Sequence, residues 1–160
     1  MKYARLSKEQ FESLHEEFAL FLATQSIDKK QWDQIKTENL TLTDELLDLF
    51  SNVVWDQSLD KITYLENRSD HHLFLFKCLD KRIDLILIQL ESNCPSLSEK
   101  DYKRWLGEHL TDPQVSIFES NRIFNEDFKK EKFKLMEQGA LVTDGAVSYT
   151  HLRAHETRHD

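Results

Sequence analysis

Glycine and proline are scarce in this chain of 160 residues, which has three Gly and two Pro. So few helix-breaking residues favour long helices over a sandwich of short strands and tight turns. The glycines stand at positions 107, 139 and 145. The sequence therefore lacks the glycine-rich loops that cradle phosphate groups and the Gly-x-Ser-x-Gly turn that presents a nucleophilic serine. The common nucleotide-binding and serine-hydrolase sites are thereby excluded.

Cysteine is equally rare, and Cys78 and Cys94 stand sixteen residues apart in no metal-binding or redox spacing. The simplest interpretation is two unbonded thiols in a reduced compartment. No stretch approaches the ~20 apolar residues that a membrane-spanning helix needs. The N-terminal sequence MKYARLSKEQ also lacks the apolar core of a signal peptide. We therefore expect a cytoplasmic protein.

Positive charge is in deficit, with 21 Lys and Arg against 29 Asp and Glu and a formal net charge of −8. A surface of this sign repels phosphate groups, so neither nucleic acid nor an anionic membrane is an expected partner. Another protein is the partner class that remains. The chain length is that of one domain, and we expect a single globular domain over residues 1–146.

Two capping boxes mark the first helices. Ser7 and Gln10 predict a helix that begins at Lys8 and continues to Thr24, because their side chains can satisfy each other's backbone N–H groups. Asp28 and Gln31 form the same pattern before a second helix. A third helix is expected over residues 41–58, where apolar residues recur at helical spacing.

Two further helices are predicted in the second half of the chain. Ser98 and Asp101 form a possible capping box for a short helix that includes Trp105 and Leu106. The last helix is expected over residues 125–138, with Phe128, Leu135 and Met136 facing inward and Gly139 as its C-cap.

The most apolar stretch is Leu73–Leu90, which is interrupted by the charged triplet Asp80-Lys81-Arg82. We interpret it as two strands joined by a hairpin turn, although its apolar residues also fit a helical period and periodicity alone does not decide. Extended segments are also expected at residues 62–66 and, as one or two strands, at 115–124. The predicted fold class is α+β: N-terminal helices packed on a small, mainly antiparallel sheet, with further C-terminal helices.

Histidine motifs do not define a metal site. His15-Glu16 begins the zinc-binding pattern H-E-x-x-H, but Ala19 stands where the second histidine is required. The pair His71-His72 near Cys78 fits no known ligand spacing. We expect no metal and no cofactor, and we assign no catalytic residue.

Tryptophan residues are the candidates for an interaction surface, since Trp often anchors protein interfaces. Trp32 and Trp55 are the two candidates, and Trp105 is a third Trp of the same kind. All three stand beside apolar stripes, so core or half-buried packing is the favoured alternative.

Two functional hypotheses follow. The first is a non-catalytic protein-interaction or regulatory module, because no catalytic motif is present. The alternative is a small enzyme with an acidic or histidine-containing pocket, in which His71, His109 or Cys94 would meet carboxylates from other segments. The first predicts an exposed aromatic patch, and the second predicts a concave site.

Several stretches resemble a family of small bacterial proteins of unknown function from the Bacteroidota. The resemblance is carried by MKYARLSKEQFESLHEEFALFLATQSIDKKQW, FSNVVWDQSLDKITYLE, LFLFKC and FKLMEQGALVTDG, and it covers most of Met1–Gly145. It implies a cytosolic bacterial protein whose relatives continue past the position of Gly145. It transfers no catalytic residue, because the family has none assigned.

The segment Val147–Thr157 reads VSYTHLRAHET and, back-translated, resembles the end of a transposon-based sequencing adapter. We therefore interpret Val147–Asp160 as adapter-derived and the natural C-terminus as missing. Its three His residues, spaced four apart, would otherwise indicate a zinc site, and they are left out of the functional interpretation.

Overall fold

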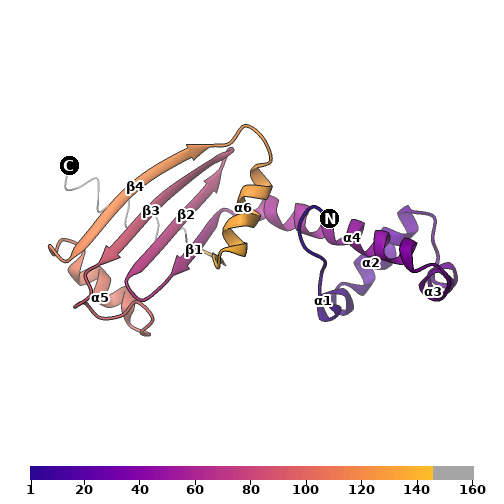
Figure 1. Cartoon of the computed structure of the whole chain (residues 1–160), viewed down its shortest axis with the longest axis horizontal. Helices are drawn as coiled ribbons and strands as arrows, with labels where there is room; N and C mark the ends of the chain where they lie inside the picture. Colours follow the sequence, from indigo (N-terminus) through magenta and orange to yellow (C-terminus); the bar gives the residue numbers. More distant parts are fainter. Residues whose placement is uncertain (146–160) are drawn as a thin grey trace. The chain divides into compact units, whose positions relative to one another are not determined.

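The computed structural model describes residues 1–145, in which six helices and a five-stranded antiparallel sheet are found (Figure 1). The N-terminal helices precede the sheet and further helices follow its third strand and its fourth, so the predicted α+β class is confirmed. The adapter-like segment lies outside the described residues.

The described chain forms two compact units. The first, Met1–Asp60, is called the helical unit, and the second, called the sheet unit, begins at Lys61. The expectation of one domain over residues 1–146 stays a prediction, because a compact unit need not be able to fold by itself.

Four helices make up the helical unit, the last of them ending one residue beyond it: α1 (Lys8–Ser13), α2 (His15–Thr24), α3 (Lys29–Glu38) and α4 (Leu40–Lys61). Both predicted capping boxes are present, at Ser7 with Gln10 and at Asp28 with Gln31. The predicted third helix corresponds to α4, and the Asn39 side chain accepts the backbone N–H of Leu42 in its first turn.

The single helix predicted over residues 8–24 is wrong, because the chain breaks between α1 and α2 at Leu14. Nδ1 of His15 lies 3.0 Å from the carbonyl oxygen of Glu12, and Ser13 Oγ donates to the carbonyl of Gln10. Gln10 still accepts the backbone N–H of Leu14, so these side chains add local contacts at the break. The apolar spacing continues across Leu14, which is why periodicity alone predicted one helix.

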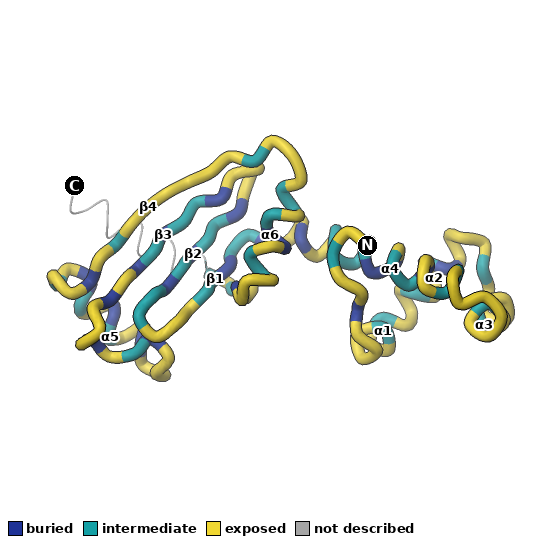
Figure 2. The backbone as a smooth tube through the Cα atoms, viewed as in Figure 1, coloured by how far each residue is buried: buried dark blue, intermediate teal, exposed yellow. Residues whose placement is uncertain are grey.

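Five strands form the sheet of the second unit: β1 (Tyr64–Arg68), β2 (His72–Leu79), β3 (Arg82–Leu90), β4 (Val115–Ile123) and β5 (Leu141–Thr143). Their order is β4-β3-β2-β1-β5, and every neighbouring pair is antiparallel. The two central strands β2 and β3 confirm the strand interpretation of Leu73–Leu90 against the helical alternative. Buried positions alternate with less buried ones over much of both strands (Figure 2).

The β2–β3 hairpin turns through Asp80 and Lys81, whose φ angles are 54° and 60°. Two consecutive positive φ angles define a type I′ turn, whose twist matches that of the flanking strands. Asn-Gly is the usual sequence for this turn, so Asp-Lys forms it at a steric cost at Lys81. Strand pairing over eight residue pairs therefore overrides the weak turn signal.

Replacing Lys81 by glycine should stabilise the protein by about 0.5–1 kcal/mol, because glycine adopts positive φ without steric cost. Urea unfolding measures the change. The matched control is Lys77→Gly in the extended backbone of β2, which should destabilise by a similar amount. Equal signs for the two variants would contradict the turn geometry.

One face of the sheet packs against α5 (Tyr102–His109) and the loop before it. The buried cluster joins strand and helix residues: Leu73, Leu75, Ile86, Ile88, Leu90, Cys94, Leu97, Tyr102, Leu106, Leu110 and Val115. The predicted capping box at Ser98 and Asp101 is wrong. Ser98 Oγ instead lies 2.7 Å from Ser96 Oγ, and Ser96 donates to Asp70, so the loop is tied to the β1–β2 turn.

The helix α6 (Phe128–Glu137) lies beside the other face of the sheet. Its residues share a cleft with strand residues that alternate with those packed against α5. It begins later than predicted, after Asp127 with φ 47°. Its end is a Schellman motif: Gly139 at φ 108° donates to the carbonyl of Met136, and Ala140 donates to that of Leu135. The predicted glycine C-cap is therefore confirmed.

Candidate functional site: an aromatic cluster in the helical unit

Five aromatic rings meet in the helical unit, and we call them the aromatic cluster: Phe11 of α1, Phe18 and Phe21 of α2, Trp32 of α3 and Phe50 of α4. Phe50 is central, since its ring centroid lies 5.0 Å from that of Phe18, 5.5 Å from Phe21 and 5.9 Å from Phe11. The separations and tilted or edge-on angles are those of favourable aromatic pairs.

The cluster is only partly covered. Phe50 is 2% exposed, whereas the other four rings are half-buried. A unit of 60 residues has too little interior to enclose five large rings. The cluster is therefore both the core of the helical unit and an apolar surface on it.

The charge of the helical unit is strongly negative. It contains six Lys and Arg against twelve Asp and Glu, a net charge of −6 out of −8 for the whole chain. Acidic residues stand in the first turn of both α1 and α2. Half-buried aromatic rings in an acidic unit are suited to a cationic, partly apolar ligand.

Trp32 belongs to the cluster and stands half-buried at one side of it. Its ring meets that of Phe18 at 81° with 5.2 Å between centroids. Nζ of Lys36 lies 5.8 Å from the ring centroid and 3.3 Å from the Asp33 carboxylate. Trp32 thus contributes to packing and still presents part of its surface, as the favoured alternative of half-buried packing predicted.

Trp55 has a different setting. Its indole Nε1 donates to the carbonyl of Ala4 at 3.0 Å, and its ring lies 6.4 Å from that of Tyr3. It is half-buried as well. Trp55 therefore holds the N-terminal segment through a hydrogen bond and a ring contact.

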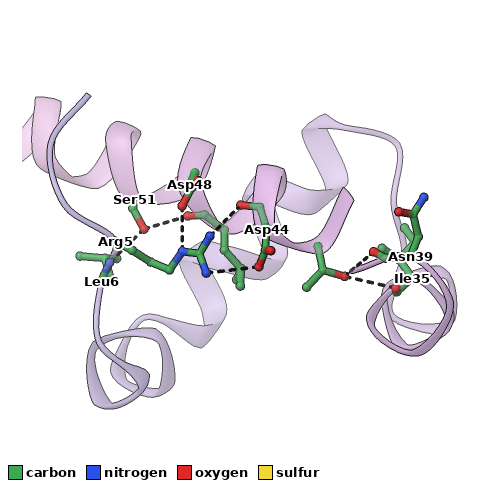
Figure 3. A network of polar contacts seen from close by, with 9 residues as sticks. Arg5, Leu6, Ile35, Asn39, Asp44, Asp48 and Ser51 are labelled. Atoms are coloured by element: carbon green, nitrogen blue, oxygen red, sulfur yellow. Dashed lines mark hydrogen bonds and ion pairs between the residues drawn. The ribbon is translucent and has the colours of Figure 1, made fainter. Parts of the chain in front are cut away.

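The N-terminal segment, residues 2–6, is fixed to α4 by side chains (Figure 3). Arg5 Nε lies 2.7 Å from Asp48 and Nη1 lies 3.3 Å from Asp44, and the hydrogen bond to Asp48 raises the pKa of the guanidinium. Leu6 donates its backbone N–H to Ser51 Oγ, which is fully buried and donates to the carbonyl of Leu47. The exposed ion pairs contribute little to stability, so the buried Ser51 contact fixes the register of the segment.

The residues proposed for a catalytic pocket have separate structural roles. His71 Nε2 lies 3.2 Å from the carbonyl oxygen of Cys94, and Cys94 Sγ donates to Gln114 at 3.4 Å. His109 Nδ1 lies 2.7 Å from the carbonyl oxygen of Trp105, on whose ring its own ring stacks. The structure therefore brings the His71 ring to the backbone of Cys94, and each of the two histidines lies beside a backbone carbonyl oxygen.

A small cleft of about 190 Å³ lies between α5 and the loop before it, lined by Glu99, Asp101, Tyr102, Trp105 and neighbouring residues. It has carboxylates but neither histidine nor cysteine among its lining residues. Burial raises the pKa of Tyr102, and so does the hydrogen bond that its hydroxyl donates to Glu66 at 2.9 Å. A neutral tyrosine with a fixed acceptor is not an activated group, so the cleft does not match the predicted enzyme site.

Cys78 and Cys94 are both free and buried. Burial raises the pKa of Cys78 to about 11, although the nearby cation of Lys132 lowers it. A thiol with so high a pKa is protonated at neutral pH and a poor nucleophile. Cys78 is therefore a core residue of the sheet unit.

Lys132 is a buried charged residue that was not predicted from the sequence. It is 4% exposed, and its Nζ donates to the carbonyl of Ile62 at 2.8 Å and lies 4.8 Å from the Phe128 ring centroid. A signal was present, because Lys132 stands one helical turn after Phe128 and one turn before Met136, on the predicted inward stripe.

Neither a metal-binding group of side chains nor a membrane-spanning helix is present in residues 1–145. No group of three or more His, Cys, Asp or Glu side chains in this range is arranged to hold a metal ion. None of its helices combines the length and the apolar character that crossing a membrane requires.

A helical unit followed by a five-stranded antiparallel sheet with two further helices defines a small α+β protein. The chain belongs to a family of unknown function (DUF6495), whose family model matches residues 1–155. No curated protein and no solved structure matches the chain. The predicted resemblance to a family of unknown function is thus confirmed, and the bacterial source stays a prediction.

The family match also includes residues 147–155 of the adapter-like segment. Its proposed origin remains to be tested by genomic sequence past Gly145, which either continues as VSYTHLRAHET or departs from it.

Proposed function

We propose that the protein is a non-catalytic protein-interaction module whose helical unit binds a basic, amphipathic segment of another protein. The observation that carries this proposal is the aromatic cluster, in which four of five rings are half-buried within a unit of net charge −6. Aromatic side chains supply large apolar contacts, and the acidic surroundings select the sign of the partner's charge.

Trp32 is the proposed anchor of this surface. Its ring can be covered further without loss of its contact with Phe18, and a cation over the exposed part of the ring would gain cation–π attraction. Lys36 already occupies a position 5.8 Å from the ring centroid. A basic side chain of the partner would compete for the same ring and for the Asp33 carboxylate beside it.

A reduced compartment fits this proposal, since both cysteines are free and buried. We accordingly place the protein in the cytoplasm. The cleft between α5 and its preceding loop gives the enzyme alternative no support, because none of His71, His109 and Cys94 is among its lining residues.

Titration calorimetry with two peptide probes tests the proposal on the full chain. A helical peptide of about 18 residues built from Leu and Lys should bind, and its counterpart built from Leu and Glu should not. Binding of the basic peptide should weaken as salt is raised, because exposed charges are screened. Equal binding of the two peptides would contradict the proposal.

Variants locate the binding surface. Trp32→Ala should weaken binding of the basic peptide about tenfold or more, whereas Trp32→Phe, which keeps a ring, should lose less. The matched control is Trp105→Ala, which removes a half-buried Trp from the sheet unit and should leave the affinity unchanged. Circular dichroism shows that each variant is folded. An unchanged affinity in a folded Trp32→Ala protein would overturn the assignment.

A further inference from the structure

Among residues 1–145, the strand β4 forms one long edge of the sheet. It has nine residues, its register with β3 is continuous without a bulge, and in the described chain it pairs with β3 alone. It contains no proline, and its Phe118 and Ile123 side chains are 52% and 67% exposed. Long, flat edges with exposed apolar side chains pair with further strands unless charges, prolines or bulges prevent it.

The hydrogen bonds at both ends of β4 show which backbone groups face outward. Phe124 donates its N–H to the carbonyl of Lys81, and Glu91 donates to the carbonyl of Gln114. Since antiparallel pairs alternate, the even-numbered residues of β4 exchange hydrogen bonds with β3. The odd-numbered residues, such as Ile117, Asn121 and Ile123, direct their backbone groups away from β3.

The side chains of β4 are self-complementary about one residue. We propose that a second copy of the chain adds to this edge, with the two β4 strands antiparallel about a two-fold axis at Ser120. Ile117 then faces Ile123 of the other copy as a hydrogen-bonded pair, and Phe118 faces Arg122 as a cation–π pair. The Arg122 guanidinium already lies 5.0 Å from the ring centroid of Phe124 in its own chain, so it is positioned on a face of the strand that carries aromatic rings.

Neighbouring registers are less favourable. A two-fold axis normal to the sheet leaves each side chain on the same face of the sheet. Since directly opposite side chains also lie on the same face, the axis must pass through a residue and not between two residues. An axis at Glu119 would place two Glu119 side chains directly opposite each other, and like charges there are destabilising. An axis at Phe118 would place Glu119 opposite Ile117. The Ser120 register avoids both pairings.

Disulfide trapping tests the register on the full chain. Ser120 lies on the axis as a non-hydrogen-bonded pair, where opposite Cα atoms are about 4.5 Å apart, within the range that a disulfide spans. Ser120→Cys should therefore form a disulfide-linked dimer under mild oxidation. The matched control is Ser116→Cys on the same strand, equally exposed, whose two copies would be about 26 Å apart and should stay unlinked. Equal cross-linking of the two variants would overturn the register.

Asn121→Pro tests the interface without cysteine. Its N–H faces outward, so proline removes a donor from the edge and none from the β3 ladder. Sedimentation should show a dimer for the natural sequence and a dissociation constant raised about tenfold or more for the variant, with an unchanged far-UV circular dichroism spectrum. A monomeric natural sequence, or a dimer that Asn121→Pro leaves intact, would overturn the proposal.

Discussion

Replacing Phe50 by alanine should lower the free energy of unfolding by about 3–5 kcal/mol, the range for a buried phenylalanine. Phe50 is 2% exposed and contacts three other rings of the aromatic cluster. Those rings come from α1 and α2, so the cavity would open between these helices and α4. Urea unfolding followed by tryptophan fluorescence measures the loss, since Trp32 of the cluster meets the Phe18 ring edge-on.

The control for this variant is Leu20→Ala on α2. Leu20 stands next to Phe21 in the sequence but is 69% exposed, so its truncation should change the unfolding free energy by less than about 0.5 kcal/mol. Similar losses for the two variants would show that Phe50 is not the centre of the helical unit.

A larger effect is expected at Ile86, where aspartate should prevent the sheet unit from folding. Ile86 is fully buried on β3, between Leu75 of β2 and Glu119 of β4. The substitution removes an apolar contact worth about 2–5 kcal/mol and adds the cost of a buried carboxylate without a counter-ion. The sum equals or exceeds the stability of an ordinary domain. Far-UV circular dichroism should show the loss of strand signal at 25 °C.

Two further substitutions on β3 calibrate that result. Gln89→Asp introduces the same charge at an exposed position of the strand and should cost no more than about 1 kcal/mol. Ile86→Val removes one methylene and should cost about 0.5–1.5 kcal/mol. A folded Ile86→Asp protein would show that this face of the sheet is accessible to water.

Elements with a strong local signal could be predicted from the sequence. The capping boxes of α1 and α3 depend on side chains three residues apart. Gly139 supplies the positive φ angle that the end of α6 requires at one position. Strands β2 and β3 could be chosen over a helix because isoleucine and phenylalanine are frequent on both sides of a short charged turn. In each case the deciding residues lie in one continuous stretch of the chain.

Other elements depend on distant partners. Strand β5 has three residues and pairs with β1, more than seventy positions earlier, so nothing in its own sequence marks it. The Ser98 side chain was expected to cap a helix, but Ser96 and Asp70 supply other contacts. For Lys132, the carbonyl of Ile62 is a partner seventy positions away.

The candidate site was predicted in part for the same reason. Trp32 was chosen by residue type, and the structure places it in the aromatic cluster through its contact with Phe18. The rings of the other helices that join the cluster are known only once the helices are packed. Trp55 was chosen on equal grounds, yet its indole bonds to Ala4, 51 positions away. The edge of β4 was not considered at all, since an edge exists only once the strand order is known.

The contacts that fix residues 2–6 to α4 also bear on biosynthesis. They join the N-terminal segment to Asp44, Asp48, Ser51, Asn52 and Trp55, all within the first 60 residues. A nascent chain that has emerged from the ribosome as far as α4 therefore carries both sides of these contacts while the strands are still being synthesised. The helical unit can therefore fold before the sheet unit. An extension fused ahead of Met1 would have to extend past α4 without displacing the contacts of Arg5 and Leu6.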